Sequence, residues 1–114
     1  MTRPMGRRSV ALAHGGFNVA TGLWALLHLR SFEAVTGPKT DHWLVRTVAA
    51  LVVANGLVQL TSDPAAARRL GLGTAAALAG IDLAYVPRGT IRPVYLLDAA
   101  VELGWVASWL RARP

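Results

Sequence analysis

The 114-residue chain contains no cysteine. Disulfide bonds, thiolate nucleophiles, iron–sulfur clusters and zinc sites with cysteine ligands are therefore excluded. The three histidines lack the spacing of a metal site, so we expect no metal and no other cofactor. The sequence also lacks a phosphate-binding loop, a dinucleotide-binding glycine fingerprint and a serine–histidine–aspartate arrangement.

Acidic side chains are scarce, with six aspartates and glutamates against twelve lysines and arginines and a net charge of +6. A basic excess of this kind is common in nucleic-acid-binding proteins. Here the basic residues lie almost entirely between and around the apolar stretches of the chain. We therefore expect no nucleic-acid partner and interpret the basic excess as loop and terminal charge that faces anionic lipid headgroups.

Charge is nearly absent from four apolar stretches, which lie at 9–29, 43–62, 70–86 and 94–110. These stretches hold 75 residues but only 4 of the 18 charged side chains. Such segregation is typical of a chain in a bilayer, where a buried charge costs several kcal/mol. Helices of these lengths reach across a hydrocarbon core of about 30 Å, the last two at the short end of the range. The sequence predicts one all-α domain, 1–114, an integral membrane bundle of four transmembrane helices running up and down.

A soluble four-helix bundle is the alternative interpretation of the same pattern. It would need a polar face on every helix. The first apolar stretch offers only His14, Asn18, Thr21 and His28 among 21 residues. The membrane interpretation is therefore favoured.

Proline and glycine mark the connections at 36–41, 62–69 and 87–93. Asp63 followed by Pro64 predicts the N-cap and first residue of a helix.

Arginine is enriched on one side of the predicted membrane domain. An even number of spans places both termini on the same side, and the positive-inside rule assigns the more basic side to the cytoplasm. We therefore expect the inner (plasma) membrane of a cell, with both termini cytoplasmic. The seven arginines on that side are Arg3, Arg7, Arg8, Arg68, Arg69, Arg111 and Arg113, against four basic residues on the other side.

Small residues indicate where helices approach each other in a membrane. Gly15 and Gly22 are seven residues apart and share one helical face. Ala76, Gly80 and Ala84 form a ridge with four-residue spacing, which we expect at a helix interface.

Amide side chains inside the spans are expected to hydrogen-bond between helices rather than to bind ligands. Asn18, Asn55 and Gln59 are the three candidates, and His14 is interpreted as a packed polar side chain. Asn55 lies about 180° around its helix from Arg46, so these polar groups cannot all line one narrow pocket.

The charged side chains inside the spans mark the candidate chemistry, because ionisable groups are rare there. Tyr95, Asp98, Glu102, Trp105 and Trp109 recur at steps of three and four residues, which places them on one helical stripe. Two carboxyl groups one turn apart repel when both are ionised, so we expect at least one to hold a proton near neutral pH. Glu102, near the middle of its span, is the candidate proton donor, and Asp98 is the candidate charged partner.

Arg46 and Asp82 enter the predicted membrane from the same face as Asp98 and at a similar depth. We therefore expect a buried cluster of Arg46, Asp82 and Asp98, with His28 and His42 near its rim. The alternative is that Arg46 extends to the headgroups and the aspartates pair with the arginines of the last loop. The candidate catalytic residues are Glu102, Asp98 and Asp82, and the candidate binding residues are Arg46, Tyr95, Trp105 and His28.

A resemblance to small four-span bacterial membrane proteins of uncharacterised function is found in two segments, FEAVTGPKTDHWLVRTV at 32–48 and IDLAYVPRGTIRPVYLLDAAVEL at 81–103. The resemblance covers most of the chain and includes the charged residues of the spans. The four-span plan is similar to that of DoxX-like proteins. The resemblance implies an architecture and brings no activity, cofactor or site with it.

Three classes of function stay open. The first is a non-catalytic membrane component or binder of a lipophilic small molecule, as a monomer or a homodimer among membrane lipids. The second is a membrane enzyme that acts on a lipophilic substrate, with Glu102 as general acid and Asp98 or Asp82 as base. The third is an oligomeric proton-coupled transporter.

Overall fold

The computed structural model describes residues 5–114, and these residues form five α-helices. The predicted all-α fold is therefore confirmed. Each predicted span coincides with a long helix to within a few residues, except that the helix of the third span begins six residues before that span, at the start that the capping signal predicts. The helices are α1 (Arg7–Leu27), α2 (Leu29–Thr36), α3 (His42–Thr61), α4 (Pro64–Tyr85) and α5 (Tyr95–Arg111).

The start of α4 follows the predicted capping signal. The Oδ1 atom of Asp63 accepts a hydrogen bond of 3.0 Å from the backbone N–H of Ala66, and Pro64 is the first helical residue. A capping side chain of this kind satisfies a backbone donor that has no partner within the helix. The prediction for this helix start is confirmed.

By length and composition, α1 and α3 are the two helices among residues 5–114 that are long and apolar enough to cross a membrane. The α5 helix has only 17 residues, and α4 is rich in alanine and glycine, which are weakly apolar. Four membrane spans therefore stay a prediction at this point.

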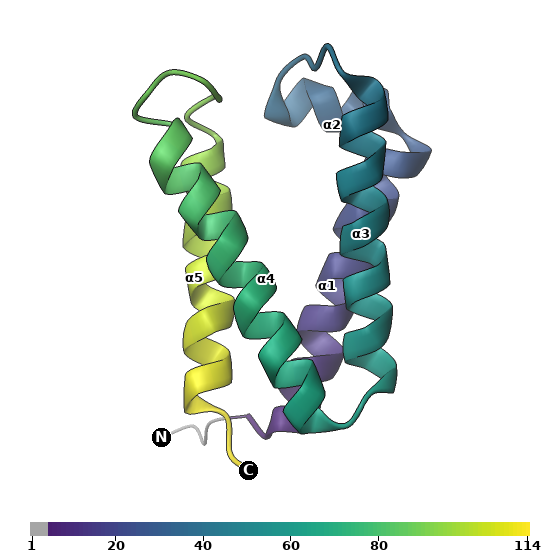
Figure 1. Cartoon of the computed structure of the whole chain (residues 1–114), viewed down its shortest axis with the longest axis vertical. Coiled ribbons are helices and arrows are strands. Elements are labelled where there is room, and N and C mark those ends of the chain that lie inside the picture. The colour runs from purple at the N-terminus through teal and green to yellow at the C-terminus, as the bar shows by residue number, and fades with distance from the viewer. Residues whose placement is uncertain (1–4) are drawn as a thin grey trace.

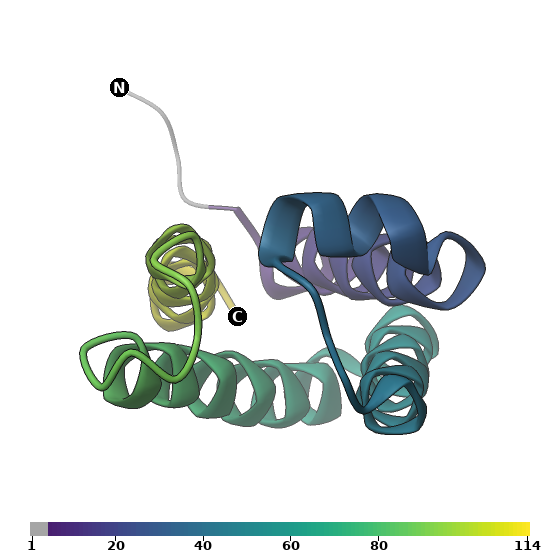
Figure 2. The same ribbon diagram turned by 90° about the horizontal axis from the view of Figure 1, so that it is seen from above.

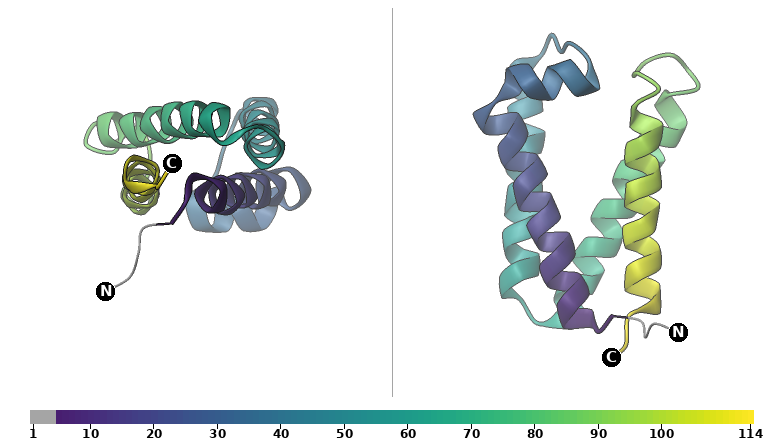
Figure 3. Two further views of the ribbon diagram at one scale, coloured as in Figure 1. Left: turned by 90° about the horizontal axis from the view of Figure 1, so that it is seen from below. Right: turned by 180° about the vertical axis from the view of Figure 1, so that it is seen from behind.

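The long helices form two antiparallel pairs, α1 with α3 and α4 with α5 (Figure 1). The pairs meet at the end that holds the termini and the α3–α4 connection, and they diverge toward α2 and the α4–α5 connection (Figures 1 and 3). Seen from above, α2 lies over α1 (Figure 2). We call the end where the pairs meet the closed end and the other the open end. At the closed end the start of α1 is hydrogen-bonded to the C-terminal segment, since the backbone N–H of Arg7 donates to the carbonyl oxygen of Arg113 at 3.0 Å.

Glycine allows α1 and α3 to approach each other closely. A Cβ atom added at Gly56 would lie 2.6 Å from the carbonyl oxygen of Gly15, and one added at Gly22 would lie 2.7 Å from that of Ala49. Real side chains do not tolerate such distances to backbone atoms, so these positions require glycine. The predicted packing face of Gly15 and Gly22 is confirmed.

The predicted small-residue ridge on α4 is wrong, because Ala76, Gly80 and Ala84 are all exposed. The buried side of α4 is rotated by one residue, about 100°, from this ridge. The face that is buried contains Asp82 as well as small residues, whereas the face of the predicted ridge does not contain Asp82. The buried small residues are Ala67, Gly71, Ala75 and Ala79.

We predict that Gly56→Ala destabilises the protein by about 1–3 kcal/mol, because the added methyl group meets the α1 backbone and forces the helices apart. Gly16→Ala is the matched control, since a Cβ atom there has no neighbour within 4 Å. Alanine favours a helix over glycine by up to about 1 kcal/mol, so the control should be neutral or stabilising. Equilibrium unfolding of the purified variants, followed by circular dichroism, measures both. Equal effects at the two positions would contradict the close helix contact.

Candidate functional site

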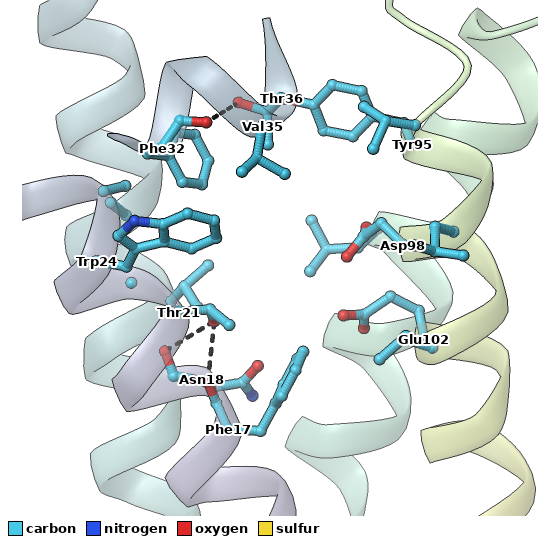
Figure 4. A pocket seen from close by; sticks show the side chains of 18 residues that line it. Phe17, Asn18, Thr21, Trp24, Phe32, Val35, Thr36, Tyr95, Asp98 and Glu102 are labelled. Atoms are coloured by element: carbon cyan, nitrogen blue, oxygen red, sulfur yellow. Dashed lines mark hydrogen bonds between the residues drawn. The ribbon is translucent and has the colours of Figure 1, made fainter. Parts of the chain in front are cut away.

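A cavity of about 350 Å³ lies between the two helix pairs, toward the end where they diverge. Its lining comes from α1, α2, α3 and α5, with one residue from α4. Most of the lining is apolar. The polar exceptions are Asn18, Thr21 and Thr36 on one side and Asp98 and Glu102 on the other (Figure 4).

Aromatic side chains of α1 and α2 form one wall of the cavity (Figure 4). The rings of Trp24 and Phe32 meet edge to face with centroids 5.2 Å apart, and the indole N–H of Trp24 donates to the hydroxyl of Ser31 at 2.8 Å. Phe17 lines the cavity one helical turn below Thr21. The indole donor is thus satisfied on the side of Ser31, and this wall presents ring surfaces to the cavity.

The carboxyl groups of Asp98 and Glu102 form the opposite wall (Figure 4). They are four residues apart on α5, so their side chains point in the same direction. The side chain of Glu102 is only 1% exposed, and its Oε2 atom has no hydrogen-bond partner among residues 5–114. A buried polar atom without a partner is costly, and a ligand in the cavity would satisfy it.

Asp82 of α4 belongs to the same group of acids, although it does not itself line the cavity. It is 4% exposed, and its carboxyl group is close enough to those of Asp98 and Glu102 to interact with them electrostatically. The structure therefore brings together the three predicted acids, here called the carboxyl cluster: Asp82, Asp98 and Glu102.

No basic side chain among residues 5–114 forms an ion pair with the carboxyl cluster. The ion pair found in this part of the chain joins His42 to Glu33 at 3.4 Å, near the surface. Arg88 lies over the ring of Tyr85 at 5.4 Å, and the side chain of Arg92 packs against Gly37. The alternative in which the loop arginines neutralise the aspartates is therefore not observed.

Arg46 does not join Asp82 and Asp98, so the predicted arginine–aspartate cluster is wrong. Arg46 is exposed and does not line the cavity. On the same helix, the amide of Asn55 donates to the hydroxyl of Thr74 on α4 at 3.1 Å. Arg46 lies about 180° from Asn55 around α3, so it points away from α4. The position of Arg46 along the length of α3 is consistent with the predicted cluster, but the direction in which its side chain points around the helix axis is not.

Two further predicted binding residues, His28 and Trp105, lie outside the cavity lining. The Nδ1 atom of His28 accepts a hydrogen bond from the backbone N–H of Ser31 at 3.3 Å, so His28 is the N-cap of α2. Trp105 stacks on His14 with ring centroids 4.6 Å apart. Tyr95 does line the cavity, and its ring lies 5.2 Å from the ammonium nitrogen of Lys39.

A buried polar network joins α1, α3 and α5 near the closed end. The amide of Asn18 donates to Gln59 Oε1 at 2.7 Å, and Gln59 Nε2 donates to His14 Nδ1 at 3.0 Å. The indole N–H of Trp109 donates to the same His14 nitrogen at 3.0 Å. Because two donors converge on Nδ1, His14 is a neutral imidazole with its proton on Nε2. The prediction that Asn18, Asn55 and Gln59 bond between helices is confirmed.

The sequence predictions include neither the aromatic wall nor α2. The first predicted span ends at residue 29 and the predicted connection begins at 36, so no element is predicted between them. The helical signal of α2 is the spacing of Phe32, Val35 and Thr36, which places them on one face, toward the cavity. A serine three residues after His28 is a second signal, because it allows the helix cap.

Comparison with protein-family models, curated proteins and solved structures finds no match to this chain. The resemblance to small four-span membrane proteins therefore stays a prediction.

We predict that Gln59→Leu lowers the free energy of unfolding by about 1–3 kcal/mol, because it leaves the buried amide of Asn18 without an acceptor. Asn55→Leu on the same helix is the control. Its hydrogen bond is partly exposed, so its loss should cost about 1 kcal/mol or less. Equilibrium unfolding provides the values.

The double variant Asn18→Leu/Gln59→Leu should lose less than the sum of the two single variants, because both members of the pair are replaced by apolar groups. Strictly additive losses would contradict a coupled buried network.

Proposed function

We propose that the protein is an integral membrane protein of four spans that binds a lipophilic small molecule in the cavity between its helix pairs. The main support for the membrane location is the distribution of side chains. Large apolar residues are exposed on every long helix, whereas several fully buried side chains are polar. Soluble proteins show the opposite distribution and rarely expose large apolar areas. Examples of the exposed residues are Leu27 (78%), Trp43 (69%), Ile81 (53%), Leu97 (70%) and Leu110 (63%).

The dimensions of the molecule fit a bilayer. Its longest extent is 42 Å, against about 40–45 Å for a bilayer with its headgroup regions. The α4 helix has 22 residues, or about 33 Å at the α-helical rise, so its length suffices for a span despite its weak hydropathy. The α5 helix, with 17 residues, is at the lower limit.

Arginine gathers at the closed end, where the termini and the α3–α4 connection lie (Figure 1). This end is proposed to face the cytoplasm, in line with the positive-inside rule. Arg3, which contributed to the prediction, lies outside the described residues. The described arginines at this end are Arg7, Arg8, Arg68, Arg69, Arg111 and Arg113.

Ligand binding is supported most by the contrast between the cavity's walls. Small-molecule sites are mostly apolar, range from about 300 to 1,000 Å³ and contain a few polar groups that orient the ligand. This cavity has about 350 Å³, an aromatic wall and two carboxyl groups facing it. The unpartnered Oε2 atom of Glu102 is the observation on which the proposal depends.

A membrane enzyme is the second candidate, and the same atom favours it. A protonated Glu102 facing an apolar cavity is where a general acid for a lipophilic substrate would lie. The enzyme would bind its ligand in the same way, so binding is tested first.

Four spans with cytoplasmic termini predict a simple labelling pattern, because the chain has no cysteine of its own. Thr40→Cys lies in the α2–α3 connection and Thr90→Cys in the α4–α5 connection, both at the end where the helix pairs diverge. Each single variant should react with a membrane-impermeant maleimide added outside intact cells. Ser62→Cys in the α3–α4 connection should react only after the cells are lysed. Labelling of all three positions from one side, or recovery of the protein without membranes, would contradict the four-span topology.

The cavity itself predicts saturable labelling by a small lipophilic photoprobe, trifluoromethyl-iodophenyl diazirine, in nanodiscs. An excess of non-photoactive analogue should suppress attachment at the cavity residues Phe17 and Trp24, whereas attachment at exposed Trp43 should persist. Thr21→Trp should remove most of the saturable labelling, because its indole fills the cavity. Ala20→Trp, on the exposed side of α1, is the matched control and should label as the wild type does. Unsaturable labelling at every position would contradict a binding cavity.

A further inference from the structure

We propose that the ligand is a lipophilic organic cation, an apolar body that carries one protonated amine or quaternary ammonium group, and that the carboxyl cluster holds its charge. This inference rests on the proposed binding function and names the class of ligand. The juxtaposition behind it is Asp98 and Glu102, the members of the carboxyl cluster on α5 that line the cavity, opposite the aromatic wall of α1 and α2 (Figure 4).

The first argument is the charge balance of the cavity. Asp82 and Glu102 are each at least 96% buried, and each has a carboxylate oxygen without a hydrogen-bond partner in the described chain. A buried acid is stable only when it is protonated or paired with a positive charge. Residues 5–114 supply no ion pair to this cluster. An ammonium group would supply the missing positive charge, and a protonated amine would add hydrogen-bond donors, whereas a neutral hydroxyl group would satisfy one oxygen and bring no charge.

The second argument is the aromatic wall. Trp24 and Phe32 line the cavity on the side opposite the carboxyl groups, and Phe17 lies at its lower end, where its ring is 5.5 Å from that of Trp105 on α5 (Figure 4). The face of an aromatic ring attracts a cation, and the attraction strengthens when water is excluded. The same wall also provides apolar surface for the body of the ligand. An ion between the two walls would therefore lie between carboxyl groups on one side and aromatic rings on the other.

The third argument comes from the rim of the cavity, where a cation of the protein itself lies over an aromatic ring that lines the cavity. The ammonium group of Lys39 lies 5.2 Å from the ring centroid of Tyr95 and donates to the carbonyl oxygens of Thr36 and Gly37, at 3.0 and 2.9 Å. These contacts hold Lys39 at the rim and leave the interior acids for a ligand.

Other ligand classes fit the cavity less well. An anion would meet the carboxyl cluster and be repelled by it. A metal ion is disfavoured, because the described residues contain no group of three or more side chains placed to hold one. The apolar lining excludes small hydrated cations, which would lose their water on entry.

The test compares two probes of nearly the same shape, 1-adamantanemethylamine, which is cationic at pH 7, and 1-adamantanemethanol, which is neutral. Equilibrium dialysis against the protein in phosphatidylcholine nanodiscs measures binding, with empty nanodiscs correcting for partition into lipid. We expect the amine to bind at least about tenfold more tightly than the alcohol, since a charge-assisted contact contributes about that much.

Glu102→Gln and Asp98→Asn are expected to remove the preference for the amine while they retain binding of the alcohol, which also shows that the variants are folded. Glu33→Gln alters a carboxylate at the surface pair with His42 and should keep the preference. Equal binding of both probes, or an amine preference that survives both amide variants, would overturn the cation proposal and leave the binding function intact. Binding of neither probe, together with unsaturable photolabelling, would overturn the binding function as well.

Discussion

The hydrogen bonds around His14 are the constraint on which the arrangement of the helices depends. His14 of α1 accepts from Gln59 of α3 and Trp109 of α5, so one side chain connects the two helix pairs. The indole of Trp109 fits there because the neighbouring position on α4 is Gly71, where a Cβ atom would clash with it. With the pairs joined at this end, their divergence toward α2 leaves the space that the cavity occupies.

Four of the six largest fully buried side chains in the described part of this protein are polar, whereas a soluble domain buries mainly apolar ones. On the proposed membrane location, apolar side chains gain little from burial, so helices associate through small residues and hydrogen bonds. The glycine contacts between α1 and α3 and the pair of Asn18 and Gln59 are of these two kinds. Both hold helices together without large apolar side chains, which the molecule places on its outer surface.

Sequence patterns predicted the position of each polar side chain along its helix better than the direction in which it points around the helix axis. The stripe from Tyr95 to Trp105 could be predicted because its residues lie on one helix, whose periodicity is fixed. Whether Arg46 meets Asp82 depends on how two helices rotate against each other, and the glycine and amide contacts of α3 decide that. The cavity's aromatic wall depends on α2, whose start is set by a local cap at His28 that has no apolar signal.

The separation of charge along the chain has a consequence for the carboxyl cluster. The basic residues of the loops are committed elsewhere, Arg88 to the ring of Tyr85 and Lys39 to carbonyl oxygens and Tyr95, so the cluster is left to be neutralised by protons or by a ligand. A proton and an organic cation compensate the same negative charge, so the cluster attracts either of them less strongly once the other is bound. If the ligand is an organic cation, protonation of the cluster therefore lowers its affinity for the cation, and a bound cation lowers its affinity for the proton by the same factor.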